Sequence, residues 1–440
     1  MTKENLNASS MLETLVKTTD YLKKNDLKTV NDKMKEPIEQ IYSGISTLTE
    51  SFYGCEKLEG NSVLDNLKNS MENEAPLDPF FEEFDKWHTI FKNDLETLEQ
   101  YPLTLDQDFY KLMLRIHNVS SEDLLANQKA ELEKIKTKSE KNYKKLVEFY
   151  NSFSYYWGKL NPDDNVYEHF EMCNSELKEN ADKYTWLYEK LADYRSKRVL
   201  YGVLKFWIDL DFEYKNTLVE KNFSEYFDLD ILNANSTNGD LNEEVFVDCG
   251  AYTGTSILEF TKNYSSYKKV IAYEMVPSIF ENLKEELKDY ENIEFFNNAI
   301  SSNGMSKKKA FISNNSKVST TSLLDPENAS LYDEGEEAPN TPDSLVPIEI
   351  TTIDHEISEP ITFIKMDIEG SETDAIKGAK NHIKYDKPKL AIAAYHKYGD
   401  LWNIADMLSK LNPNYKFYLR YNGATNGYMA SEYVIYAINA

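Results

Sequence analysis

Beyond residue 240 the sequence alternates short β-branched runs with amphipathic helical segments, and this alternation constrains the fold more than any other feature. Runs rich in valine and isoleucine predict strands at 245–249, 269–274, 293–297, 361–367 and 389–394. Helices are predicted between them at 279–290, 372–383 and 401–411. This order predicts an α/β domain with a parallel sheet covered by helices on both faces. The last two runs, at 416–421 and 433–438, predict an antiparallel hairpin at one edge.

Residues 1–240 have a different pattern, which is typical of helices. They hold 6 glycines and 5 prolines, whereas residues 241–440 hold 9 and 8. Ser120, with Asp123 three residues later, predicts an N-terminal cap, and further helices are predicted at 177–201 and 203–218. The predicted domains are therefore a helical domain at 1–170, a helical connector at 171–240 and the α/β domain at 241–440.

Charge and cysteine content exclude several classes of protein. The chain has 75 acidic and 49 basic residues, a net charge of -26 that repels phosphate backbones, so we expect no nucleic-acid partner. The most apolar window, 199–210, is too short to span a bilayer, so we expect no membrane insertion. Three scattered cysteines predict neither a disulfide framework nor a zinc cluster, and this low usage favours a reducing, cytoplasmic location.

The first predicted strand ends in a polar turn that contains Asp248, Gly250 and Gly254. Ligands of open parallel sheets bind beyond the carboxyl ends of the strands, and glycine lets a ligand approach the backbone closely. The turn lacks the three glycines of a dinucleotide site and the Lys-Ser/Thr pair of a triphosphate site, so it favours a hydrogen-bonding or cationic ligand. An ordinary strand-to-helix turn is the alternative.

A second acid, Glu274, ends the next strand 26 residues after Asp248. An acid at this distance commonly binds the two hydroxyls of a ribose, although it would also complement the dipole of a helix that begins at Pro277. Asn298 follows the third strand, where its amide would read a base edge or simply form a turn.

The fourth strand is followed by three carboxylates, Asp367, Glu369 and Glu372. Strand alternation places Lys365 on the same side as Asp367, which predicts an ion pair between them. His396, one of only 6 histidines, ends the fifth strand, beside Asp367 in a parallel sheet. These groups predict a reaction centre, whereas the alternative for Glu369 and Glu372 is to complement a helix dipole.

Together these segments resemble the FkbM family of S-adenosylmethionine-dependent methyltransferases. The resemblance covers about 241–440 and rests on VFVDCGAYTG at 245–254, AYE at 272–274, NAIS at 298–301, IKMDIEGSE at 364–372 and the region of His396. A looser resemblance to the helical lead-in of some family members extends back to about Lys183, through FSEYF at 223–227. It implies a class I methyltransferase-like Rossmann sheet that binds S-adenosylmethionine. The residues that it assigns to the cofactor are Asp248, Gly250, Ala251, Tyr252 and Gly254 for the methionine part, Glu274 for the ribose, and Asn298 with Ala299 for the adenine.

Family members mostly methylate hydroxyl groups, often of sugars in natural products or in surface and flagellin glycans, so the resemblance implies a small-molecule or glycan acceptor. Methyl transfer needs a base near the acceptor, and we expect Asp367 or His396 in that role. Alternatively, Asp367, Glu369 and His396 hold a divalent cation, magnesium or manganese, that acidifies the hydroxyl.

Two other classes of function stay open: a cofactor-binding scaffold protein without catalysis, and a metal-dependent hydrolase. The aromatic-rich helical part would form a homo-oligomer or cradle a sugar, although aromatic residues at helical spacing are also typical of a core. The polar segment 313–347 predicts either a substrate-covering loop or a surface insert, with strands at its flanks near 310–313 and 346–353.

Overall fold

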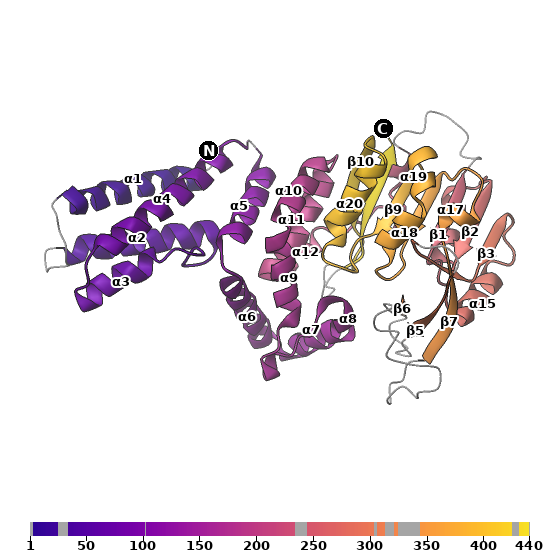
Figure 1. Ribbon diagram of the computed structural model, residues 1–440, viewed down its shortest axis with the longest axis horizontal. Helices are drawn as coiled ribbons and strands as arrows, with labels where there is room; N and C mark the ends of the chain where they lie inside the picture. Colours follow the sequence, from indigo (N-terminus) through magenta and orange to yellow (C-terminus); the bar gives the residue numbers. More distant parts are fainter. Residues whose placement is uncertain are drawn as a thin grey trace. The chain divides into compact units, whose positions relative to one another are not determined.

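The computed structural model describes residues 3–24, 34–101, 103–233, 244–302, 306–312, 321–323, 344–424 and 431–439 (Figure 1). Contacts between residues divide the chain into two units, a helical unit (Met1–Thr185 with Leu204–Asp211) and a sheet unit (Trp186–Val203 with Phe212–Ala440). The predicted boundary at 240 lies outside the described residues, and the division into 1–170, 171–240 and 241–440 stays a prediction.

The helical unit is built from amphipathic helices whose apolar faces are buried. These helices are α1 (Lys3–Lys24), α2 (Lys35–Tyr53), α3 (Val63–Asn73), α4 (Asp78–Glu99), α5 (Thr104–Asn118), α6 (Ser121–Lys138), α7 (Glu140–Ser152), α8 (Ser154–Trp157) and α9 (Glu168–Glu179). The buried indole N–H of Trp87 on α4 donates to Thr49 Oγ1 on α2 at 3.0 Å. The predicted cap at Ser120 is confirmed, because its Oγ accepts from the Asp123 N–H at 3.0 Å.

The helices predicted at 177–201 and 203–218 are both interrupted, so the predicted bounds are wrong. The chain instead forms α10 (Ala181–Lys190), α11 (Tyr194–Asp209) and α12 (Phe212–Asn216). Asp193 starts α11 by accepting a hydrogen bond from the Ser196 N–H at 2.7 Å. Leu210, with a φ of 50°, ends it because a positive φ leaves the helical path. The apolar periodicity continues through these breaks, which is why it predicted longer helices.

The sheet unit contains a seven-stranded sheet in the order β10-β11-β9-β8-β1-β2-β3. Its strands are β1 (Val245–Cys249), β2 (Lys269–Tyr273), β3 (Ile293–Phe296), β8 (Phe363–Met366), β9 (Lys389–Ala393), β10 (Tyr415–Tyr421) and β11 (Tyr433–Asn439). β1 pairs in parallel with β2 and β8, β2 with β3, and β8 with β9, as predicted. β11 is antiparallel to both β9 and β10, which confirms the predicted edge hairpin.

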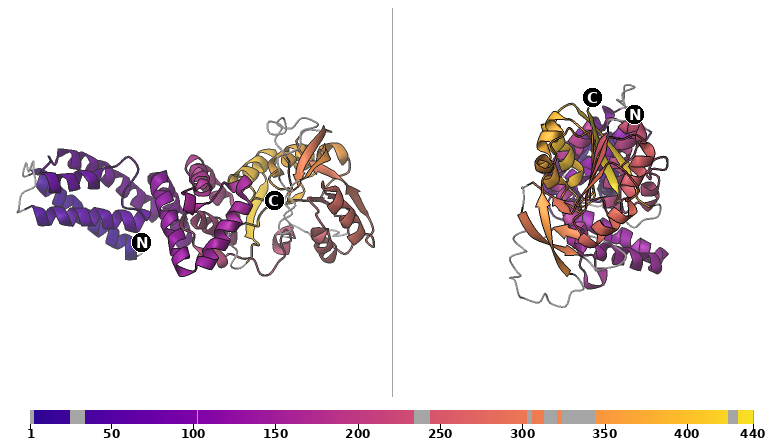
Figure 2. Two further views of the ribbon diagram at one scale, coloured as in Figure 1. Left: turned by 90° about the horizontal axis from the view of Figure 1, so that it is seen from below. Right: turned by 90° about the vertical axis from the view of Figure 1, so that its right-hand side faces the viewer.

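Helices cover both faces of this sheet, as the edge-on view in Figure 2 shows. On one face, Phe246, Val270, Phe363 and Ala391 pack in one apolar cluster with residues of α13 (Leu229–Leu232), α14 (Thr255–Asn263) and α15 (Pro277–Glu286). On the other, α20 (Asp400–Leu411) packs on β10, β11 and α18 (Glu372–Gly378). The helix predicted at 372–383 is divided between α18 and α19 (Lys380–Tyr385).

The edge strand β10 is covered by two segments that precede the sheet in the sequence. Leu191 and Val219 form isolated parallel bridges with Phe417 and Tyr421. The N–H of Ala192 also donates to the Phe417 carbonyl at 2.8 Å. Residues before 241 therefore pair with backbone groups that an edge strand otherwise leaves open.

A second, four-stranded sheet has the order β4-β7-β5-β6. It consists of β4 (Asn298–Ile300), β5 (Ser306–Ile312), β6 (Thr321–Leu323) and β7 (Ser344–Thr351), and α17 (Ile353–Glu356) follows it. The strands predicted near 310–313 and 346–353 correspond to β5 and β7. Most of the predicted covering loop, 313–320 and 324–343, lies outside the described residues.

The loop after β1 is pressed against the end of β8. The Asp367 N–H donates to the Cys249 carbonyl at 3.0 Å. Gly250 has a φ of +81°, and a Cβ there would lie 1.9 Å from the Asp367 carbonyl oxygen. Only glycine therefore fits this crossing, both for its backbone conformation and for the space available. None of the described helices is long and apolar enough to cross a membrane.

We expect Gly250→Ala to destabilise the protein far more than Gly60→Ala. Both glycines have similar positive φ values, +81° and +71°, but a Cβ at Gly60 would meet no atom within 4 Å. The strain of φ alone costs about 1–2 kcal/mol, and overpacking against backbone adds about 1–3 kcal/mol at Gly250. Urea unfolding of both variants measures the difference; equal losses would contradict the crowding described here.

Candidate functional site

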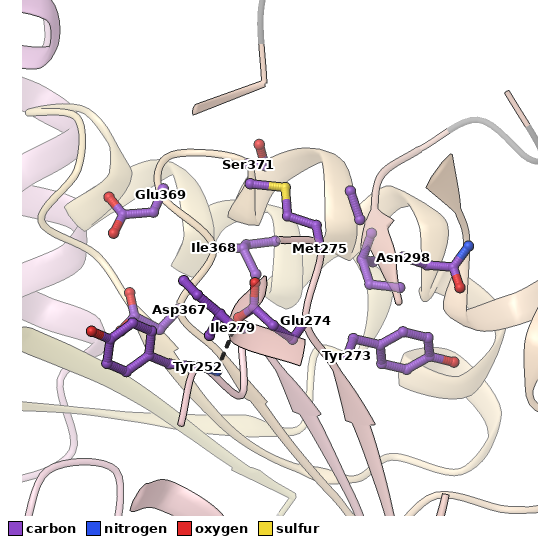
Figure 3. A pocket seen from close by; sticks show the side chains of 13 residues that line it. Tyr252, Tyr273, Glu274, Met275, Ile279, Asn298, Asp367, Ile368, Glu369 and Ser371 are labelled. Carbon is purple, nitrogen blue, oxygen red and sulfur yellow. Dashed lines mark hydrogen bonds between the residues drawn. The ribbon is translucent and has the colours of Figure 1, made fainter. Parts of the chain in front are cut away.

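A cavity of about 250 Å³ opens at the carboxyl ends of β1, β2 and β8 (Figure 3). Seven of the residues predicted for the site line it: Gly250, Tyr252, Glu274, Asn298, Ala299, Asp367 and Glu369. The other four predicted residues, Asp248, Ala251, Gly254 and His396, do not line this cavity. Sequence reasoning missed Tyr273, Met275, Ile279, Ile300, Ile368 and Ser371, most of them direct neighbours of predicted residues.

Asp248 is fully buried beneath the cavity and belongs to an ion pair. Its Oδ1 lies 3.0 Å from Lys365 Nζ, and its Oδ2 accepts from Ser256 Oγ. The predicted pair of Lys365 with Asp367 is therefore replaced, because the parallel register sets Asp248 directly beside Lys365. Lys365 Nζ also donates to the Gly250 carbonyl at 2.8 Å, which fixes the loop. Burial lowers the pKa of Lys365, but the charges of Asp248 and Asp367 more than offset it and raise it.

Glu274 is held at the cavity wall by two backbone N–H groups. Tyr252 donates to its Oε2 at 3.0 Å, the dashed line in Figure 3, and Val276 donates to its Oε1 at 2.8 Å. Tyr252 adopts a φ of 48° to aim its N–H, while its side chain is exposed. Burial raises the pKa of Glu274, although both N–H bonds favour the carboxylate. Each oxygen keeps accepting capacity for a ligand hydroxyl.

The wall beyond Glu274 is largely apolar. Met275, Ile279 and Ala299 of β4 all line the cavity, and Met275 packs against the apolar cluster that contains Ala299. Figure 3 shows the amide of Asn298, also on β4, directed away from Glu274. An apolar slot beside an anchored carboxylate suits a flat ring joined to a pair of hydroxyls.

His396 is 2% exposed and lies among three carboxylates. Its Nδ1 is 3.0 Å from Glu372 Oε1, and its Nε2 is 3.4 Å from Glu369 Oε2 and 3.6 Å from Asp367 Oδ1. Tyr395, which sequence reasoning missed, donates its hydroxyl to Asp367 Oδ1 at 3.2 Å. The ends of β8 and β9 thus bring the predicted Asp367, Glu369 and His396 together, with Glu372 in direct contact.

These carboxylates decide the charge of the histidine. Burial lowers the pKa of His396, but Glu372 and Glu369 outweigh burial and raise it well above its ordinary value. For Glu372 the net shift is the opposite. Burial alone would raise its pKa, but the charge of His396 and the hydrogen bond from the Ile368 N–H outweigh burial and lower the pKa below its ordinary value. His396 and Glu372 therefore form an imidazolium–carboxylate pair at neutral pH.

The same groups have the geometry of a metal centre. Asp367, Glu372 and His396 each offer a ligand atom, and these atoms lie within 4.8 Å of one another. The predicted metal set named Glu369 in place of Glu372. One oxygen of the fully buried Glu372, Oε2, has no hydrogen-bond partner among the described residues. A cation there would neutralise that oxygen.

Two further acids, Glu225 and Glu432, come from segments distant in the sequence. Burial, together with the charges of Asp367 and Glu432, raises the pKa of Glu225 to about 8. Burial and Asp367 also raise the pKa of Glu432. Glu432 lies in no motif, and Glu225 lies in the segment FSEYF at 223–227, to which sequence reasoning gave no chemical role.

Comparison with known proteins identifies the domain that carries this cavity. Residues 248–421 match the family model of the methyltransferase FkbM domain. No curated protein matches the chain. Among solved structures, a methyltransferase FkbM from Methylobacillus flagellatus KT shares 23% identity at a TM-score of 0.45, and the alignment covers 62% of each chain.

Two other solved structures are more distant. An rRNA methylase from Streptococcus thermophilus shares 15% identity over 45% of this chain and 87% of its own, with a TM-score of 0.27. A protein of Streptococcus mutans in complex with SAH shares 12% identity over 52% of this chain and 96% of its own, with a TM-score of 0.26. The family match confirms the resemblance found in the sequence: residues 248–421, which carry the whole lining of the cavity, match the methyltransferase FkbM domain.

Proposed function

We propose that the protein is an S-adenosylmethionine-dependent methyltransferase that methylates a hydroxyl group of a small molecule or glycan. The observation that carries this proposal is Glu274, anchored by two backbone N–H groups at the wall of the cavity in an FkbM domain. A carboxylate held in this way is ready to accept the two hydroxyls of a ribose.

The residues around Glu274 fit the remaining parts of the cofactor. Met275, Ile279 and Ala299 would enclose the adenine, and the Gly250 backbone would lie along the methionine part. When bound, the cofactor supplies a methyl group on a positively charged sulfur. Asp367 and Glu369 line the same cavity and favour this positive charge over the neutral product SAH. Their carboxylates would therefore favour both the binding of S-adenosylmethionine and the release of SAH.

Asp367 is the favoured base. It lines the cavity, and its Oδ1 accepts from the Tyr395 hydroxyl at 3.2 Å, which orients the carboxylate. His396 is less suited, because its raised pKa leaves it protonated at neutral pH. Its imidazolium, held by Glu372, would instead position Asp367 and limit the repulsion between the carboxylates.

A second version of the centre uses a divalent cation. The ligand atoms of Asp367, Glu372 and His396 favour it, with Glu369 close by. Two carboxylates and an imidazole suit manganese better than magnesium, which prefers oxygen ligands only. The cation would displace the proton of His396 and acidify the acceptor hydroxyl. A cofactor-binding scaffold without turnover is the remaining alternative.

We expect the wild-type protein to bind SAH in titration calorimetry, and Glu274→Ala to weaken that affinity by at least about tenfold, because two charge-assisted hydrogen bonds are lost. The control is Glu281→Ala, which removes an exposed acid from α15. Absence of binding by the wild type would overturn the proposal. Unchanged affinity in Glu274→Ala would remove Glu274 from the cofactor site.

The affinity for SAH should also depend on pH. Burial raises the pKa of Glu274, so acidification protonates it at a pH above the ordinary glutamate value of about 4.3, and the affinity falls there. The stability of the ligand-free protein changes with pH in the opposite direction. Because the pKa of Glu274 is raised in the folded state, its contribution to stability is lost as the pH rises through that pKa. Calorimetry across pH should show this fall in the wild type and a flat profile in Glu274→Gln.

Asp367→Asn should lower kcat by about 10²–10⁴-fold while leaving SAH affinity nearly unchanged, because only the base is lost. Turnover is measured as SAH release with S-adenosylmethionine and a panel of sugars and glycans, and Asp374→Asn, an exposed acid of α18, is the control. Loss of turnover in EDTA that manganese restores would select the metal version. If Asp367→Asn and His396→Asn both kept full turnover, this centre would not be the reaction centre.

A further inference from the structure

A second pocket, of about 100 Å³, collects most of the arginines of the chain. It is lined by Arg195, Arg198, Thr217, Glu220 and Arg420 and otherwise by apolar side chains, all within the sheet unit. We call it the arginine pocket. The chain has 45 lysines but only four arginines, and three of the four line this one pocket.

This concentration calls for a chemical reason, because lysine supplies almost all positive charge elsewhere. Arginine differs from lysine in its planar fork of donors, which matches the oxygens of carboxylates and phosphates. Where a lysine-rich chain uses arginine, the geometry of the fork matters more than the charge. Some of these hydrogen bonds hold the fold together, and the three arginines differ in how many of their donors are used in this way.

Arg420 is committed to the framework. It is 4% exposed, its Nε donates to Asp228 Oδ2 at 2.6 Å, and its Nη2 donates to Asp193 Oδ2 at 2.8 Å. Burial lowers its pKa, but the two acids outweigh burial and raise it. Arg420 therefore forms a rigid base of the pocket, and two carboxylates more than balance its charge.

The other two arginines face the pocket from the first turns of α11. Arg195 forms an ion pair with Glu220 and keeps a side-chain exposure of 47%. Arg198 donates from Nη2 to Thr217 Oγ1 at 2.6 Å and to the Thr217 carbonyl at 3.3 Å. Both of these acceptors are neutral oxygens, and within the described residues no carboxylate forms an ion pair with Arg198.

We propose that the arginine pocket binds a tetrahedral oxyanion, a phosphate or sulfate group, between Arg198 and Arg195. The volume of about 100 Å³ is several times the roughly 10–15 Å³ that one water molecule needs, which is room for one such group. The forked donors supply charge-assisted hydrogen bonds, and the Arg420 network holds the first turns of α11 in place.

Strand register relates this pocket to the methyl-transfer cavity. Arg420 pairs with Val434, and Val434 pairs with Ala393. Ile392 pairs with Met366, so Ala393 lies level with Asp367. The backbone of Arg420 is thus three strand spacings from the backbone of Asp367, or about 14 Å at about 4.8 Å each. An acceptor whose phosphate or sulfate lies at a distance of this order from its hydroxyl would be anchored at Arg198 and Arg195; this extension rests on the proposed function.

The test measures phosphate and sulfate binding to the full chain by calorimetry, in chloride buffer of matched ionic strength. We expect binding by the wild type, a loss of at least about tenfold in Arg198→Gln, and a partial loss in Arg198→Lys, which keeps charge but loses the fork. Lys197→Gln is the matched control, because it removes an equal charge from the same helix outside the pocket. No binding by the wild type, or equal binding by Arg198→Gln, would overturn the proposal.

SAH binding, measured on the same samples, separates a folding defect from a lost anion site and tests the proposed function independently. The source of the oxyanion is distinguished by competition. If a hexose phosphate displaces inorganic phosphate and binds more tightly, the group belongs to an acceptor. If inorganic phosphate binds and hexose phosphate does not, the site is for the free ion and the link to the acceptor is overturned.

Discussion

The buried ion pair between Asp248 and Lys365 is the interaction on which the candidate site depends. It joins two central strands, β1 and β8, and Lys365 carries the connection on to the Gly250 carbonyl. Removing one partner of a buried pair leaves an uncompensated charge at a cost of about 3–5 kcal/mol. The pair therefore fixes the height of the loop after β1, and with it the Tyr252 N–H that holds Glu274.

The candidate site also holds more carboxylates than positively charged groups, so its negative charge is only partly neutralised. His396 balances one of the three carboxylates that surround it. Two nearby carboxyl groups are instead protonated more readily than usual. Burial and neighbouring acids raise the pKa of Asp400 to about 7 and that of Glu225 to about 8. Such a centre gains from any bound cation, whether a sulfonium or a metal ion. The acidity of this chain thus acts locally, and is not only a property of its solvated surface.

The sequence predicted the sheet well because period and order carry that information. The parallel strands, the edge hairpin and the anchored Glu274 all follow from local patterns at strand ends. The inward turn of Asp248 could not be predicted, because it depends on which strand lies beside β1. The parallel register of β1 and β8 places Lys365 beside Asp248, so the Asp248 carboxylate pairs with the Lys365 ammonium group.

Other features depended on contacts between distant segments. Of the second sheet, the sequence predicted strands only at β5 and β7, because β4 and β6 have only three residues each. Glu225 lies in the connector and Glu432 directly before β11, and their interaction with Asp367 follows from the fold and not from a local sequence pattern. The helix boundaries at Asp193 and Leu210 each depend on the conformation of one residue. The apolar periodicity of the sequence continues across both, so it did not predict them.

The bridges of Leu191 and Val219 make the connector the cover of the edge strand β10. A chain that began at the first strand of the sheet would keep every residue of the cavity wall, yet leave β10 with open donors and acceptors along one side. An uncovered edge of that kind pairs with other chains, so it would invite self-association before any loss of chemistry. The smallest piece that behaves as a domain is thus longer than the piece that carries the family motifs.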